Sequence, residues 1–116
     1  MSTVILVTDD ALRIEAGKQV AAGAAEMDNR LPDWWTGIDR VSLDLGNSYD
    51  CVLGQLFDEF EIGLELLGLN LGESERLGLY CSGDSLSQAV RDAYQLRTQL
   101  WIAEIDMREA AQALEV

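Results

Sequence analysis

Chemistry in this chain would have to come from Asp, Glu, Ser, Cys and Arg, because the sequence has 21 acidic residues, 8 basic residues and no histidine. Without an imidazole there is no general base for a Ser-His-Asp or Cys-His site. Glu61 and Glu65 are one helical turn apart, and a pair of carboxylates is the acid and base of glycosidases. One turn of helix does not form a substrate cleft, so we expect no catalytic residues.

The cysteines and acidic residues also lack the spacing of metal sites. Cys51 and Cys81 are 30 positions apart, with no CxxC pair and no histidine to complete a zinc site. The acidic residues do not follow the DxDxDG spacing of calcium loops, and neither GxSxG nor GxxxxGK[ST] occurs. We expect two buried free thiols, with a disulfide as the alternative, no metal, no cofactor and no enzyme.

The net charge of −13 is concentrated in one part of the chain. No basic residue occurs between Arg40 and Arg76, where eight acidic residues give a local charge of −8. This charge excludes non-specific binding to nucleic acid or to an anionic membrane surface. We consider three interpretations of this acidic stretch. It is a solubilising face, or a surface that docks a basic patch on another protein, or a cation site. The docking interpretation includes a DNA mimic, in which the carboxylates of this chain take the place of DNA phosphates.

A helix is predicted from Ser48 or Tyr49 to Leu67, with Gly68 in the left-handed position that follows it. At 100° per residue its large apolar side chains share one sector, which predicts a core face. Four acidic side chains share roughly the opposite side and form the predicted acidic partner-binding face: Asp50, Asp58, Glu61 and Glu65.

Two further segments precede this helix. A helix rich in glycine and alanine is predicted from about Asp9 to Asn29, with Thr8 as its N-cap, and its small residues favour close approach of another helix. An irregular connector is predicted at residues 31–46, where Pro32 blocks continuation of this helix, and it contains Trp34 and Trp35. Both indoles would fix the connector on the core, or one of them would be exposed to contact a partner.

The last helix is predicted to begin at Ser85, with Gln88 completing a capping box. Nine apolar residues follow at alternating three-four spacing, over a helix of about 43 Å. This helix is longer than a compact domain of 116 residues is wide, so it would overhang the rest of the chain. The overhang favours a homodimer through this helix, with a bent helix folded back on the core as the alternative. The predicted self-association residues come from this series and from a second stripe beside it: Tyr94, Leu100, Trp101, Ile105 and Met107.

These elements predict one mainly α domain over residues 1–116, with a three-helix core and a long C-terminal helix. Thr3–Val7 and the alternating residues Leu77, Leu79 and Cys81 leave open a small two-stranded β element. No apolar run approaches the roughly 20 residues of a membrane span. We therefore expect a cytoplasmic protein with no membrane contact and no direct nucleic-acid binding.

Residues 10–70 carry a series of short motifs. They are the small-residue segment 17–25, Pro32-Asp33-Trp34, Ile38-Asp39, Leu43-Asp44-Leu45, the DCVLGQLF stretch 50–57, Gly63-Leu64 and Leu67-Gly68-Leu69. In residue identity and order this series resembles a group of small acidic uncharacterised proteins of actinobacteriophages and actinobacteria. The start before Asp9 and the tail beyond about Arg97 are additions to that common middle.

The resemblance implies a source, not a mechanism: a phage-encoded accessory protein made in the host cytoplasm. Such a protein is expected to act without catalysis, by binding a host protein through the acidic face or an exposed tryptophan. Two alternatives stay open. One is an acidic DNA mimic that occupies the nucleic-acid site of a host protein, and the other is a small structural or assembly component built on the C-terminal helix.

Overall fold

The computed structural model describes the backbone of residues 2–115 and the side chains of residues 10–115. It is mainly α, as predicted, and its long C-terminal helix is confirmed. Residues 2–115 contain no strand, so the optional β element is not formed and Thr3–Val7 are helical. The elements in chain order are α1 (Ser2–Arg30), the 3-10 helix η1 (Trp34–Gly37), α2 (Val52–Phe57), α3 (Phe60–Leu67), α4 (Leu71–Arg76) and α5 (Gln88–Leu114).

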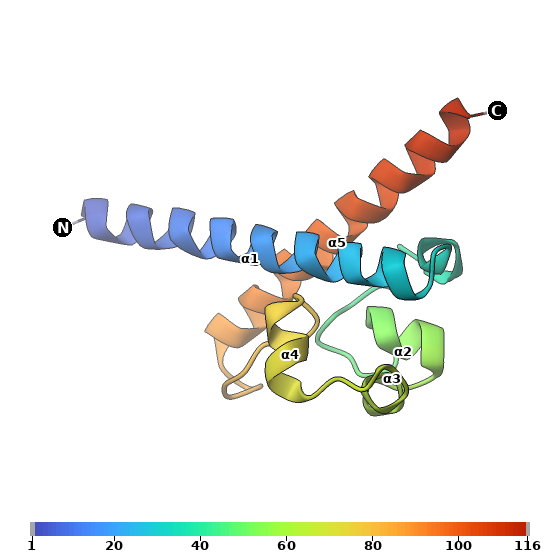
Figure 1. Cartoon of the computed structure of the whole chain (residues 1–116). Coiled ribbons are helices and arrows are strands. Elements are labelled where there is room, and N and C mark those ends of the chain that lie inside the picture. The colour runs from blue at the N-terminus through green and yellow to red at the C-terminus, as the bar shows by residue number, and fades with distance from the viewer. Residues whose placement is uncertain (1, 116) are drawn as a thin grey trace.

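The two long helices, α1 and α5, cross near their middles, and the short helices α2, α3 and α4 lie together on one side of the crossing (Figure 1). The N-terminal end of α1 and the C-terminal end of α5 project away from this body, which gives extents of 51 × 33 × 23 Å. Among residues 2–115 no helix is both long enough and apolar enough to cross a membrane.

Small side chains allow the close crossing of α1, as the sequence predicted. Ala16 and Ala24 are fully buried, and at Gly23 a Cβ atom would overlap the carbonyl oxygen of Leu77 and lie 2.8 Å from the Trp101 ring. The predicted start of this helix at Asp9 is wrong. The helix continues through the expected cap at Thr8, because the residues before it include no proline or glycine that would stop a helix.

The predicted continuous helix from Ser48 to Leu67 is also wrong, because it is broken at Asp58. This residue has a φ of 76°, Glu59 is extended, and α3 folds back against α2. At Gly63 a Cβ atom would lie 2.8 Å from Cβ of Leu53, so the two helices approach so closely that only glycine fits at this position. Gly68 ends α3 in the left-handed conformation, at φ 69°, as predicted.

The helix ends that the sequence reading missed are set by local hydrogen bonds. Asn70 and Glu73 form a reciprocal capping box that starts α4. The cap of α5 is Ser87, which accepts from the Val90 amide, and not Ser85. The earlier start is prevented because Asp84 accepts from the amides of Leu86 and Ser87 and holds this segment in a turn.

One cluster of buried side chains joins α1, η1, the connector, α2, α3 and α5. The largest of its fully buried members is Trp101, whose Nε1 donates a 2.8 Å hydrogen bond to the Gly78 carbonyl. At Gly78, with φ 70°, a Cβ atom would lie 2.8 Å from the backbone of Val20, so this turn packs directly on α1. Helices α3 and α5 both pack one side on this cluster, and their opposite sides face outward.

Candidate functional site

The two adjacent tryptophans lie at different depths. Trp34 is 2% exposed, and its Nε1 donates a 2.9 Å hydrogen bond to Asp28. Its ring packs edge-on against Trp101. Trp35 is half-buried and packs against the same core. The prediction that Trp34 contacts a partner is therefore wrong, since the core covers its indole, and Trp35 offers only part of its ring.

Arg108 joins the Trp34 indole to both long helices. Its guanidinium lies 5.6 Å from the centre of the Trp34 ring, donates to both carboxylate oxygens of Asp28 at 3.0 and 2.7 Å, and pairs with Glu104 at 2.8 Å. The hydrogen bonds from Arg108 lower the pKa of Asp28 below its ordinary value, and those to Asp28 raise the pKa of Arg108. All three of its guanidinium nitrogens donate within the chain, so this cluster stabilises the crossing of α1 and α5.

The predicted self-association residues divide into two groups. Trp101 and Ile105 are 0% and 1% exposed, so their assignment to a dimer contact is wrong: they form the core face of α5. Tyr94 is half-buried, and its hydroxyl exchanges 3.1 Å hydrogen bonds with the backbone of Cys81. Leu100 is half-buried and Met107 is 59% exposed, so these two remain available to a second chain.

Both cysteines are free and buried, as predicted. The Cys51 sulfur accepts a 3.2 Å hydrogen bond from the Gly54 amide and acts as the N-cap of α2. Burial raises the pKa of both thiols, Cys51 and Cys81. A buried thiol with a raised pKa is a poor nucleophile, and these residues contribute packing and a helix cap.

The predicted acidic face does not follow one helix. Asp50 lies before α2 and is half-buried, while Asp58 lies in the break between α2 and α3. Glu61 and Glu65 do share the exposed side of α3. The single alignment is wrong because the φ of 76° at Asp58 turns the chain. Among residues 10–115, no ion pair reaches any of the four carboxylates.

Two exposed apolar side chains on α3 were missed by the sequence reading. Ile62 is 42% exposed and Leu66 is 67% exposed, and each follows one of the exposed glutamates. Because α3 packs on α2 through Gly63 and Leu64, the opposite side of this short helix is left uncovered. We call Glu61, Ile62, Glu65 and Leu66 the α3 face.

Several arginines form ion pairs with carboxylates of the two long helices, α1 and α5. Arg30 pairs with Glu26 and donates to the Leu67 carbonyl, and Arg40 bridges to Asp106 and Glu109 on α5. These pairs neutralise carboxylates of α1 and α5. The carboxylates of the α3 face have no such neighbour among residues 10–115, so the electrostatic asymmetry of the sequence is present in space.

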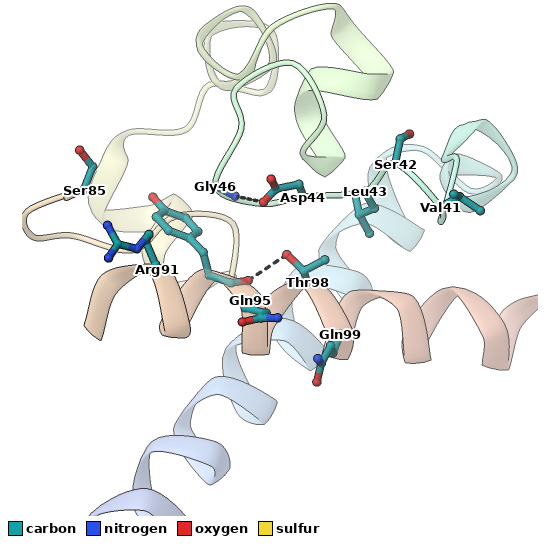
Figure 2. A pocket seen from close by; sticks show the side chains of 11 residues that line it. Val41, Ser42, Leu43, Asp44, Gly46, Ser85, Arg91, Gln95, Thr98 and Gln99 are labelled. Atoms are coloured by element: carbon teal, nitrogen blue, oxygen red, sulfur yellow. Dashed lines mark hydrogen bonds between the residues drawn. The ribbon is translucent and has the colours of Figure 1, made fainter. Parts of the chain in front are cut away.

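A cleft of about 730 Å³ lies between the connector at residues 41–46 and α5 (Figure 2). Its inner polar groups bond within the chain: Thr98 donates to the Tyr94 carbonyl at 2.8 Å, and Asp44 accepts from the Gly46 amide at 2.9 Å. The remaining polar lining offers hydroxyl and amide groups, from Ser42, Gln95 and Gln99 among others, and the guanidinium of Arg91. This cleft contains no pair of carboxylates for acid–base chemistry.

Among the residues whose side chains are described, no group of three or more Cys, Asp or Glu is arranged to hold a metal ion. Comparison with known proteins returned no matching family model, curated protein or solved structure. The resemblance to actinobacteriophage proteins therefore stays a prediction from the sequence motifs.

Proposed function

We propose that the protein is a non-enzymatic binding module, and that its α3 face docks a basic segment with apolar anchors on another protein. The observation that carries this proposal is the alternation on α3: two glutamates without ion pairs beside two large apolar side chains, all exposed on one side of the helix. The sequence resemblance adds that this partner is a host protein of an actinobacteriophage.

The apolar residues argue for more than a solubilising surface. A face that only keeps a protein in solution is polar, whereas Leu66 is 67% exposed and Leu71, at the start of the following α4, is 50% exposed. Apolar anchors supply most of the affinity at protein interfaces, and the charges around them set orientation and association rate. The α3 face has both components within one helix.

The charge of the residues around the α3 face indicates that the partner segment is basic. Residues 41–75 carry eight acidic residues and no basic one, so they repel acidic surfaces and attract basic ones. A partner segment with lysine or arginine beside leucine-type side chains complements the α3 face. A DNA mimic, in contrast, relies on a row of carboxylates, and the row expected here is interrupted at Asp58.

The test is capture from an actinobacterial lysate with three immobilised baits: the parent chain, Glu61→Lys/Glu65→Lys, and Asp33→Lys/Glu115→Lys. The last variant is the matched control, because it makes the same change in net charge at two exposed residues outside the α3 face. A protein bound by the parent and the control, lost from the Glu61→Lys/Glu65→Lys bait and released by salt supports the proposal. Equal capture by all three baits contradicts it.

A fourth bait separates protein docking from DNA mimicry. Ile62→Ser/Leu66→Ser keeps every carboxylate and removes the apolar anchors. We expect it to lose the captured protein about as fully as the charge reversals do, because apolar anchors carry affinity. Retention by this bait, with loss only on charge reversal, would point to a purely electrostatic DNA mimic and overturn the docking proposal.

A further inference from the structure

The side of α5 that faces away from the core carries a continuous apolar series. Its residues recur at three-four spacing, and two near its C-terminal end are strongly exposed: Met107 at 59% and Leu114 at 88%. At 100° per residue this series lies roughly 140° around the helix from Trp101 and Ile105, which face the core. We call it the α5 stripe: Ala89, Ala93, Leu96, Leu100, Ala103, Met107, Ala110 and Leu114.

The first half of the α5 stripe lines a groove. This groove, of about 530 Å³, lies between the N-terminal half of α1 and the start of α5. Its apolar lining is Leu12, Ala89, Ala93 and Leu96, and its polar lining is Arg13, Asp92, Gln95, Arg97 and Gln99. Leu12 is 58% exposed. The second half of the stripe lies on the C-terminal half of α5, whose opposite side packs on the body through Ile105 and Arg108 and whose end projects beyond it (Figure 1). One half therefore offers a groove and the other half an exposed helix side.

We propose that a second copy of this chain covers the α5 stripe, running antiparallel, so that the C-terminal half of each α5 fills the groove of the other copy. This pairing is its own complement, as a two-fold interface requires. With the axis crossing α5 at the level of Thr98, Ala93 of one copy faces Ala103 of the other, and Met107 faces Ala89. Large side chains then meet small ones near both ends of the stripe, and Leu96 meets Leu100 at its centre.

The charge distribution selects this side of the molecule for a second copy. The α5 helix has three arginines and four acidic residues, whereas residues 41–75 have a charge of −8. Two copies of a chain with net charge −13 repel one another least where each surface is near neutral. The α3 face is therefore left for a basic partner, and the α5 stripe for the second copy.

The contact area explains why α1 takes part. A stripe about 40 Å long and about 10 Å wide covers about 400 Å². A stable interface buries roughly 800 Å² on each partner. The groove wall on α1, where Leu12 is 58% exposed, supplies apolar surface beside the stripe and brings the contact toward this size.

The first test is the molar mass in solution, by sedimentation equilibrium, of the parent chain and of two charged variants. Met107→Asp places a carboxylate in the stripe, and Val41→Asp is the matched control at a residue that is 96% exposed and outside it. We expect twice the chain mass of 12.8 kDa for the parent and for Val41→Asp, and 12.8 kDa for Met107→Asp. A monomeric parent, or a Met107→Asp dimer equal to the parent, overturns the proposal.

The second test fixes the direction of pairing by mild oxidation of single-cysteine additions. Ala89→Cys and Met107→Cys proteins are oxidised separately and then as a mixture, with the parent as the background for the two buried native thiols. The antiparallel arrangement predicts a disulfide-linked dimer in the mixture and little in either protein alone. Cross-linking of Ala89→Cys to itself contradicts this arrangement.

Discussion

Trp34 lies edge-on to Trp101, with ring centroids 5.4 Å apart and ring planes at 89°. Trp34 belongs to η1, directly after α1, and Trp101 lies in the middle of α5. Arg108 lies over the Trp34 ring, so this contact joins the end of α1 to the middle of α5. It thereby positions the α5 stripe on one side of the molecule and the α3 face on another.

Replacing Trp34 by alanine is expected to destabilise the fold by about 3–5 kcal/mol, because it removes a buried ring and leaves a cavity beside Trp101. Trp35→Ala is the matched control, since this neighbour is only half-buried and its loss leaves most of the cluster intact. Urea unfolding followed by circular dichroism measures both. Equal destabilisation by the two variants would contradict the burial that we assign to Trp34.

The Asp28–Arg108 pair predicts a pH-dependent part of the stability. The pKa of Asp28 in the folded chain lies below its ordinary value of 3.8, chiefly because of the hydrogen bonds from Arg108. A depressed folded-state pKa means that this stabilisation is present above the unfolded pKa and is lost as the pH falls through the folded pKa. Asp28→Asn is expected to cost more stability at about pH 7 than at about pH 2.

The control for this pH dependence is Asp33→Asn, which alters an exposed carboxylate close by in the chain. Urea unfolding of both variants and the parent at the two pH values gives the differences. If the cost of Asp28→Asn were the same in acid as at neutral pH, the ion pair would contribute nothing to stability.

Two glycines of α1 predict opposite effects of the same substitution. Gly17→Ala is expected to stabilise the protein by about 0.5–1 kcal/mol, because alanine favours helix and a Cβ there meets no atom within 4 Å. Gly23→Ala is expected to destabilise it, because the new methyl group would overlap the Leu77 carbonyl and press on the Trp101 ring. Thermal unfolding of the pair, compared with the parent, decides between these signs. Two shifts in the same direction would be inconsistent with the crossing described above.

The break between α2 and α3 predicts a stabilising glycine. At a φ of 76° a side chain is strained, so Asp58→Gly is expected to leave stability unchanged or to raise it by up to about 1 kcal/mol. Glu59→Gly is the control, since Glu59 is extended and gains nothing from glycine. A loss of stability in Asp58→Gly as large as in Glu59→Gly would argue for a continuous helix through this segment.

The elements that could be predicted are those whose signal is local. Gly68 ends its helix as expected, and the small residues of α1 do allow a close crossing. The break at Asp58 could not be predicted, because the apolar periodicity runs on through it and only the packing of Gly63 on Leu53 makes the fold-back favourable. The N-cap at Ser87 could not be predicted because both Ser85 and Ser87 are suitable cap residues. The turn at Asp84 excludes Ser85 from the helix start.

The candidate surfaces were only half predictable for a similar reason. Helix α5 has two apolar sides, and periodicity alone does not say which one faces the core. The side with Trp101 and Ile105 is buried because the Trp101 ring fills the space beside Trp34, which leaves the α5 stripe outside. On α3 the glutamates were found from charge, but Ile62 and Leu66 were assigned no role because the fold-back that exposes them was not foreseen.

Docking of a basic partner on the α3 face can be tested with a photo-crosslinking amino acid at position 66. The same group at position 41, which is 96% exposed and outside α3, is the control. In an actinobacterial lysate we expect one discrete adduct with another protein from position 66, lost when Glu61 and Glu65 are changed to lysine, and none from position 41. Equal adducts from both positions, or an adduct unaffected by the charge reversals, would show that the α3 face is not the docking site.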